Sequence, residues 1–458
     1  MPVLKEEIEE DIRFILSERN RFARMEQQWA STKRCPEELQ QAFLWEIQHP
    51  IDKANKLIVG REAVVRLEGL ARTALRNAGI ARQVDDLAIK MPLGMILFRR
   101  FVIEKKPINT RNIDRALSEA AKLARRSLQT RTHFIPCHLM LATEPAEFSI
   151  GPVRFMNQKS FRSRIADQVW GDRKSYRGDS YLRRDTAKYY GNFNWVAEVT
   201  IPCCDKRISE RVATDTVTSA LDCLAILFSA SHSARMSVGG PAVKHDRRAT
   251  LQLLNGTLSF STSFAWSGEV TFPNDWAAVF ERPDYRYILN LFGVALETAI
   301  DPRLCRPLSE RFLDSALWFG EAVRERSPAA RVIKYVTALE RLVMTDEKND
   351  ITFQVATRVS AICFDPDDPE SLGQLRQEAQ RAYSLRSKLV HGSLSPKSDE
   401  VMDGVRLGAK LCELALINTL AIFGVQGLRA DKLTRSEIIS CFQRVVEQAN
   451  RDGRGDLF

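Results

Sequence analysis

The sequence predicts a mainly α-helical protein with an α+β middle region and a helical bundle at its C-terminal end. Three observations indicate this fold class. Apolar residues such as Ile8, Ile12 and Ile15 recur at helical spacing near the start of the chain. Strand-forming residues become frequent between about 133 and 201. From about residue 285 the helical period returns and continues to the end.

These changes in pattern divide the 458 residues into a helical N-terminal region (1–130), an α+β middle domain (131–300) and a C-terminal helical bundle (301–458). In the middle domain we expect strands at 133–143, 147–156 and 194–201. We expect a long amphipathic helix between Arg207 and Ser231, because apolar residues recur there at helical spacing. The run from Asp301-Pro302 to Pro307 marks the start of the bundle.

The composition is that of an ordinary globular protein, with 44% apolar and 27% charged residues. Its 67 basic and 58 acidic residues give a net charge of +9, which permits an anionic partner. The nine cysteines are scattered, without a Cys-x-x-Cys pair, as in reduced proteins. The acidic start lacks a secretion signal, and no uninterrupted apolar segment is long enough to cross a membrane. We therefore expect a cytoplasmic protein with no membrane partner.

One arginine interrupts the apolar face of a helix that is expected over about 372–391. The core positions of this helix recur at spacings of four, three, four and three residues, and they are Leu375, Ala379, Ala382, Arg386 and Leu389. Because a guanidinium stays protonated, Arg386 must be paired, lie at a subunit interface or serve a site. This misplaced charge is the strongest indication of function in the sequence.

A histidine follows this arginine at the end of the same helix. Gly392 can adopt the left-handed conformation that ends helices, and Pro396 comes soon after, so His391 belongs to the last turn. On an ideal helix the side chains of Arg386 and His391 point about 140° apart. A fraying last turn, or a second copy of the helix across a two-fold axis, would bring both to one phosphate.

Three segments in the last third of the chain have a family resemblance in their order and spacing. They are Trp318-Phe319, the run Thr337-Ala338-Leu339-Glu340-Arg341-Leu342, and Tyr383-x-x-Arg386-Ser387-x-x-Val390-His391-Gly392. This part of the chain resembles the HEPN family, and more narrowly its Apea-like branch. The resemblance implies an α-helical bundle, a metal-independent endoribonuclease and a homodimer that joins two Arg-x4-6-His motifs in one site. It also implies a role in bacterial defence against phage, with a phage-derived or protein trigger.

The resemblance assigns Arg386 and His391 as the catalytic pair and Ser387 as the polar residue beside them. In several relatives Asn, Asp or His occupies the position of Ser387. Histidine exchanges protons near neutral pH, and arginine offers a permanently charged fork that matches phosphate oxygens. RNA supplies its own nucleophile, the 2′-hydroxyl, so we expect 2′,3′-cyclic phosphate products and no cofactor. No metal site is expected either, because the histidines and cysteines lack ligand spacing.

Two other interpretations of these residues stay open. In the first, His391 only caps the helix and Arg386 pairs with an acid such as Glu340. In the second, the bundle is a non-catalytic RNA-binding or dimerising scaffold, as some HEPN domains are believed to be. The sequence alone identifies neither an RNA target nor a trigger.

Basic residues concentrate in two segments before the bundle. Residues 99–131 contain ten basic residues against three acidic ones, and 154–188 contain ten against four, interleaved with aromatic residues. Basic groups bind phosphates and aromatic rings stack on unpaired bases, so 154–188 is a candidate path for single-stranded RNA. The candidate RNA-binding residues are Arg162, Arg164, Arg173, Lys174, Arg177, Arg183 and Arg184. The alternative is a solvated basic face with its aromatic residues in the core.

Overall fold

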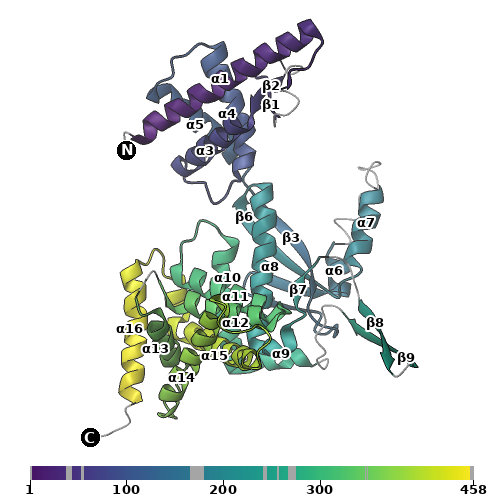
Figure 1. Ribbon diagram of the computed structural model, residues 1–458, viewed down its shortest axis with the longest axis vertical. Coiled ribbons are helices and arrows are strands. Elements are labelled where there is room, and N and C mark those ends of the chain that lie inside the picture. The colour runs from purple at the N-terminus through teal and green to yellow at the C-terminus, as the bar shows by residue number, and fades with distance from the viewer. Residues whose placement is uncertain are drawn as a thin grey trace. The chain divides into compact units, whose positions relative to one another are not determined.

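The structure is a computed structural model that describes residues 3–37, 44–52, 56–165, 180–240, 245–254, 257–266, 275–345, 347 and 349–453 (Figure 1). The chain forms two compact units. Unit 1 comprises Met1–Arg131 and Ile201–Arg211, and unit 2 comprises Thr132–Thr200 and Val212–Phe458. The prediction of a mainly α protein with a sheet in its middle region is confirmed.

Unit 1 is built from helices around a small hairpin. Its elements are α1 (Val3–Thr32), β1 (Leu44–Gln48), β2 (Lys56–Gly60), α3 (Arg61–Asn77), α4 (Asp86–Phe98), the π-helix η1 (Arg99–Ile103) and α5 (Thr110–Arg125). Ile15, Leu67, Leu93 and Leu117 belong to its buried core. The strands β1 and β2 pair antiparallel, with Leu44 opposite Gly60. The purely helical expectation for this region was therefore wrong at this hairpin, whose strands are only five residues long.

The sheet of the middle region has five strands in the order β4-β5-β6-β3-β7. They are β3 (Gln129–His138), β4 (Glu147–Ile150), β5 (Val153–Asn157), β6 (Trp195–Cys204) and β7 (Ser237–Val238). The expected amphipathic helix is α8 (Lys206–Phe228), and the short helix α9 (Ala230–Ser233) follows it. Phe148 contacts Trp195 and Trp276, with ring centroids 5.7 and 5.4 Å apart, so aromatic rings fill the space beside the sheet.

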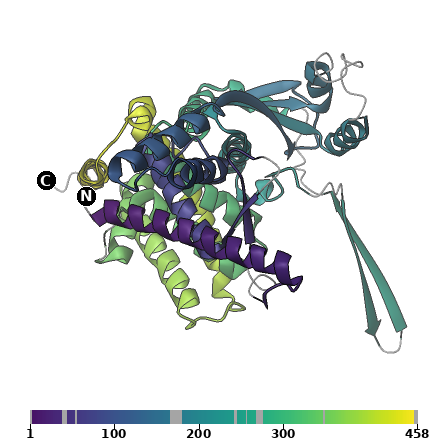
Figure 2. The same cartoon turned by 90° about the horizontal axis from the view of Figure 1, so that it is seen from above.

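Two helices and a ribbon complete this region. The helices are α6 (Gln158–Ile165) and α7 (Ser180–Tyr190), and the ribbon pairs β8 (His245–Leu254) with β9 (Thr257–Trp266). The two ribbon strands are antiparallel over their full length, with His245 opposite Trp266 and Leu254 opposite Thr257 (Figure 2). The described side chains of the ribbon, such as Gln252, Leu253 and Ser261, are exposed, and a two-stranded ribbon is only marginally stable by itself.

The C-terminal bundle begins after a short 3-10 helix, η3 (Trp276–Glu281). Its helices are α10 (Pro283–Ile300), α11 (Pro307–Arg324), α12 (Pro328–Val343), α13 (Ile351–Cys363), α14 (Ser371–Val390), α15 (Glu400–Arg429) and α16 (Arg435–Asp452). Prolines begin α10, α11 and α12, where the missing N–H is not needed for helical bonding. The expected helix over 372–391 is α14, so that prediction is confirmed.

The helix α15 packs against α10, α11, α12, α13 and α14. Gly408 allows its close approach to α12, because a Cβ there would lie 2.8 Å from the Cβ of Tyr335. Among the described residues, α15 is the one helix long and apolar enough to cross a membrane by length and composition. Its buried residues, such as Leu411 and Leu416, belong to the core of the bundle, and the core helix of a soluble protein passes the same test.

Two glycines bring the sheet and the bundle of unit 2 into backbone contact. Gly151 lies in the turn between β4 and β5 and has a φ of +53°, which favours glycine. A Cβ on Gly151 would lie 2.3 Å from the Cα of Gly293 in α10. The β4–β5 turn therefore rests directly on the backbone of α10, with no side chain between them.

Candidate functional site

The helix α14 carries the predicted motif on one side of the bundle. Leu375, Ala379 and Ala382 are buried, as the spacing predicts. Arg386 and Leu389 are only half-buried, so the core-facing stripe becomes shallower toward the end of the helix. The arginine therefore lies at the edge of the core, on the same side as the buried residues.

Arg386 is held by two neighbouring side chains. Its Nη2 lies 3.5 Å from Oε2 of Glu340 on α12, and the side chains of Arg386 and Glu340 are 26% and 21% exposed. The hydroxyl of Tyr383 donates to Oε1 of the same carboxylate at 2.9 Å. The guanidinium also lies 5.7 Å from the centre of the Tyr383 ring. One carboxylate thus links α12 to two residues of α14, and the pairing with Glu340 that one interpretation expected is present.

The phenol of Tyr383 remains protonated at physiological pH. Burial, together with its hydrogen bond to Glu340, raises the pKa of Tyr383 to about 12. A protonated phenol donates its hydrogen bond continuously, which fixes the orientation of the Glu340 carboxylate. The carboxylate in turn fixes the position of Arg386.

His391 occupies the C-terminal cap of α14. Its backbone N–H donates to the carbonyl of Ser387 at 3.0 Å. Gly392 follows with a φ of +74°, so the predicted left-handed ending is confirmed. His391 is exposed and Ser387 is half-buried. Within the described part of the chain, no hydrogen bond or ion pair joins the side chain of Arg386 to that of His391.

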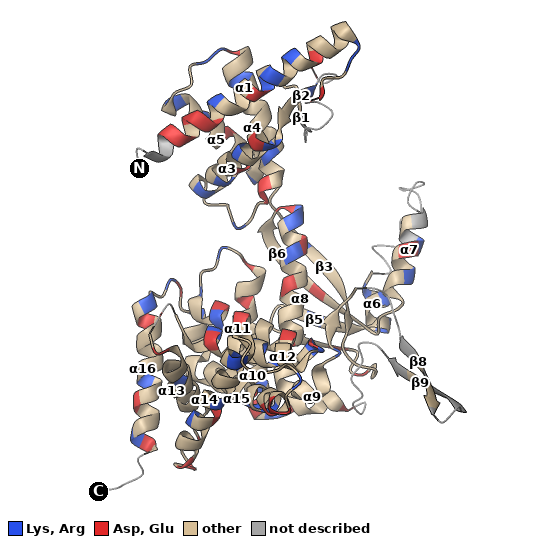
Figure 3. Cartoon of the chain, viewed as in Figure 1, with Lys and Arg blue, Asp and Glu red and all other residues tan. Residues whose placement is uncertain are grey.

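The candidate RNA-binding residues of 154–188 are only partly described. Arg173, Lys174 and Arg177 lie outside the described residues, and the side chain of Arg183 is not described either. Arg162 on α6 and Arg184 on α7 are exposed, and Figure 3 shows basic residues on both helices. Arg164 is also exposed, but its Nη2 lies 3.0 Å from Oε1 of Glu198. Arg162 and Arg184 therefore present the more available positive charge.

Two aromatic residues that were candidates for base stacking lie in the core. Phe155 is fully buried, and Phe161 is buried against Tyr190 with ring centroids 5.3 Å apart. Neither ring can stack on RNA without unfolding its surroundings. The core alternative is thus correct for these two residues.

Part of the basic segment 99–131 is engaged by contacts within its own unit. Arg99 and Arg100 both pair with Glu119 on α5. Arg125 donates to the carbonyl of Ala78 at 2.7 Å, and Arg131 donates to that of Cys204 at 2.7 Å. These contacts give four of its ten basic residues structural partners.

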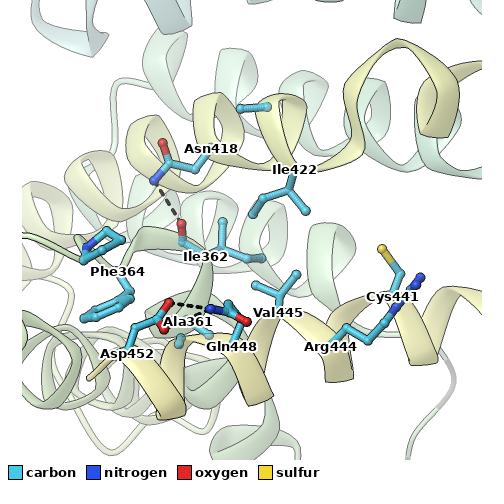
Figure 4. A pocket seen from close by; sticks show the side chains of 13 residues that line it. Ala361, Ile362, Phe364, Asn418, Ile422, Cys441, Arg444, Val445, Gln448 and Asp452 are labelled. Atoms are coloured by element: carbon cyan, nitrogen blue, oxygen red, sulfur yellow. Dashed lines mark hydrogen bonds between the residues drawn. The ribbon is translucent and has the colours of Figure 1, made fainter. Parts of the chain in front are cut away.

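Residues of α13, α15 and α16 line a pocket of about 600 Å³ (Figure 4). Apolar residues such as Ile362, Ile422 and Val445 line it, with Arg444 at its edge. The side-chain amide of Asn418 donates to the carbonyl of Ile362 at 2.9 Å, so it completes the end of α13. The pocket includes neither Arg386 nor His391.

Sequence reasoning missed a fully buried carboxylate in unit 2. Asp222 on α8 is fully buried and pairs with Arg324 on α11. The sequence pattern does not single it out, because Asp222 lies about 100° around the helix from Leu221 and so is not on the apolar stripe of Leu221 and Leu224, whereas Arg386 falls on its own stripe.

The described residues contain no group of three or more histidine, cysteine, aspartate or glutamate side chains placed to hold a metal ion. No disulfide joins any of the nine cysteines. Comparison of the chain with protein-family models, curated proteins and solved structures finds no match.

Proposed function

We propose that the protein is a metal-independent endoribonuclease of the HEPN type, and that its C-terminal bundle cuts RNA with Arg386 and His391. The observation that carries the proposal is the end of α14. There the side chain of Arg386 is held by its neighbours, and the exposed imidazole of His391 comes five residues later. An imidazole that exchanges protons and a guanidinium held in a fixed position are suited to phosphodiester cleavage.

The chemistry needs few groups from the protein. The 2′-hydroxyl of the RNA attacks the adjacent phosphorus, the bond from phosphorus to the 5′-oxygen breaks, and a 2′,3′-cyclic phosphate forms. A base takes the proton of the 2′-hydroxyl and an acid protonates the departing 5′-oxygen. His391 serves one of these steps, and Arg386 stabilises the charge on the phosphate. Ser387, which follows Arg386 in the chain, would supply a hydroxyl that hydrogen-bonds to the substrate.

A second copy of the chain completes the site. Within one chain no bond joins the side chains of Arg386 and His391 in the described residues, and Glu340 already occupies one edge of the guanidinium. In a homodimer formed through the bundle, the two motifs would supply two histidines and two arginines to one phosphate. One histidine would then act as the base and the other as the acid.

The same proposal assigns the earlier regions to RNA binding, sensing or restraint. Arg162 and Arg184 are the described cations best placed to attract an RNA strand. We place the activity in the cytoplasm and in defence against phage, where cleavage of host RNA would stop translation. A phage-derived or protein trigger would release it.

The test is cleavage of labelled RNA by the purified full-length protein in the presence of a chelator. The wild type should give fragments with 2′,3′-cyclic phosphate ends, and His391→Ala and Arg386→Ala should reduce the rate at least about a hundredfold, the scale of general acid–base catalysis. Lys388→Ala, which changes an exposed cation on the same helix, is the matched control and should retain activity. Equal cleavage by all four proteins would refute the assignment.

The Arg386–Glu340 pair favours one other function, a non-catalytic RNA-binding or dimerising scaffold. A paired arginine and a capping histidine can stabilise a bundle without any chemistry. A scaffold would bind RNA and dimerise, but the RNA would remain intact in the same assay.

A further inference from the structure

Asp222 is a fully buried carboxylate with an incomplete set of partners. Its Oδ1 accepts a hydrogen bond from Nη1 of Arg324 at 2.8 Å. Its Oδ2 is buried and has no hydrogen-bond partner among the described residues. A buried carboxylate oxygen without a donor is costly, because the charge loses its hydration without replacement. The contact between α8 and α11 therefore contains a built-in unfavourable interaction whenever Asp222 is charged.

The packing around this carboxylate is tight. A Cβ on Gly320 of α11 would lie 1.8 Å from Oδ1 of Asp222, so the carboxylate rests directly on the helix backbone. Arg324, in contrast, is 22% exposed and lies at the end of α11. The arginine can reach water, but the carboxylate cannot.

The helix α11 is bound to α12 on both sides of Glu340. The hydroxyl of Ser315 donates to the carbonyl of Ala338 at 2.6 Å. Nη1 of the buried Arg311 donates to the carbonyl of Arg341 at 2.8 Å. Asp314 pairs with the side chain of Arg341 at 2.5 Å. A displacement of α11 would therefore move the segment of α12 that presents Glu340 to Arg386.

We propose that Asp222 makes the contact between α8 and α11 a proton-sensitive joint. This joint regulates how firmly the segment of α12 that carries Glu340 is held in place beside Arg386. Uptake of a proton by Asp222 removes the buried charge and tightens the joint. Loss of the proton restores the charge and loosens it. The link to cleavage rests on the proposed ribonuclease function, whereas the joint itself does not.

The charges around Asp222 place this response near neutral pH. Burial raises the pKa of Asp222, Arg324 lowers it and Glu321 of α11 raises it, and together they bring it to about 7. Cys223 is the adjacent titratable group on α8, and burial keeps its thiol protonated by raising its pKa well above the usual value. Because the folded pKa exceeds that of a solvated carboxyl, the joint is most stable at low pH and weakens as the pH rises to about 7.

The test is amide hydrogen exchange of the full-length protein between pH 5.5 and 8.5, corrected for the intrinsic effect of pH. Amides of α11 and of 338–343 in α12 should exchange up to about tenfold faster at pH 7 than at pH 6, the limit for one proton per opening. Asp222→Asn should remove this dependence and keep exchange slow throughout. Asp215→Asn changes an exposed carboxylate on the same helix and should behave as the wild type.

The outcomes separate the joint from the nuclease. If the corrected exchange rates of the wild type do not depend on pH, the proposed joint is refuted, and this result needs no variant. An Asp222→Asn protein that keeps the wild-type dependence also refutes it. If exchange behaves as expected but no RNA is cut at any pH, the joint stands and the nuclease proposal fails. If RNA is cut and the wild-type cleavage rate changes with pH as Asp222 titrates, this change should be absent from the Asp222→Asn protein.

Discussion

Replacing Glu340 with glutamine tests whether the carboxylate between α12 and α14 positions Arg386. Glutamine has nearly the same shape and still accepts a hydrogen bond from Tyr383, but it carries no charge. The guanidinium of Arg386 would lose the partner that lies 3.5 Å away. We therefore expect Glu340→Gln to affect stability modestly and cleavage strongly.

The loss of stability follows from the geometry of the pair. At 3.5 Å and an effective dielectric constant of about 20, two unit charges attract by about 5 kcal/mol. Desolvation and solvent screening cancel most of this, which leaves about 1 kcal/mol for a pair with partial exposure. Replacing a charge-assisted hydrogen bond from Tyr383 by a neutral one costs about 1 kcal/mol more. The sum of about 2 kcal/mol should lower the melting temperature of the bundle by roughly 4–8 °C.

The effect of Glu340→Gln on cleavage follows from the position of Arg386 and not from the stability of the protein. A reacting group misplaced by about 1 Å can slow a reaction about a hundredfold, so we expect a loss of ten- to a hundredfold in single-turnover cleavage of labelled RNA. Glu378→Gln is the matched control. Glu378 lies on α14, the helix that carries Arg386, and pairs with Lys410 on α15 at 2.8 Å. It should lose similar stability but cleave normally.

Glu340→Gln cleaving as fast as Glu378→Gln, at a temperature where both are folded, would refute a positioning role for Glu340. Thermal unfolding followed by circular dichroism establishes that both variants are folded at the assay temperature. Binding of uncleaved RNA, measured by fluorescence anisotropy, shows whether the loss lies in affinity or in the chemical step.

Three further predictions concern other parts of the chain. Gly320→Ala should destabilise unit 2 by about 3 kcal/mol or more, measured by thermal unfolding, because its methyl group would overpack against Asp222. Gly373 lies at an exposed helical position with nothing within 4 Å of an added Cβ, so Gly373→Ala should stabilise unit 2 by about 0.5–1 kcal/mol in the same measurement. Arg184→Ala should lower the salt dependence of RNA binding by about one unit of slope, and Arg164→Ala, whose charge pairs with Glu198, should lower it less. Tyr383→Phe should remove the component that titrates near pH 12 from a spectrophotometric titration; loss of a component near pH 10 instead would contradict the assigned pKa.

The sequence predicted features that depend on local periodicity. Arg386 stood out because an α-helix repeats every 3.6 residues, and Gly392 marked the helix end because few other residues adopt its backbone conformation. The hairpin of β1 and β2 was missed because two five-residue strands give too short an alternation to exceed the helical pattern around them.

Contacts between distant residues could not be predicted in the same way. The basic run at Arg99-Arg100 resembles an RNA-binding surface until Glu119, about 20 residues away, folds against it. Phe155 and Phe161 have the same residue type whether they stack on a base or fill a core. The ion pair of Asp222 and Arg324 spans 102 residues, so no local pattern in the sequence could indicate it.

The paired glycines at 151 and 293 limit how this chain can change. Where two backbones touch, neither position can gain even a methyl group unless the opposite layer withdraws, and a smaller replacement does not exist. A mutation at one site therefore has no compensating mutation at the other. The turn and the helix must therefore either move apart or keep their present spacing. Sequence change at this contact is limited to glycine at both positions unless the sheet and the bundle separate.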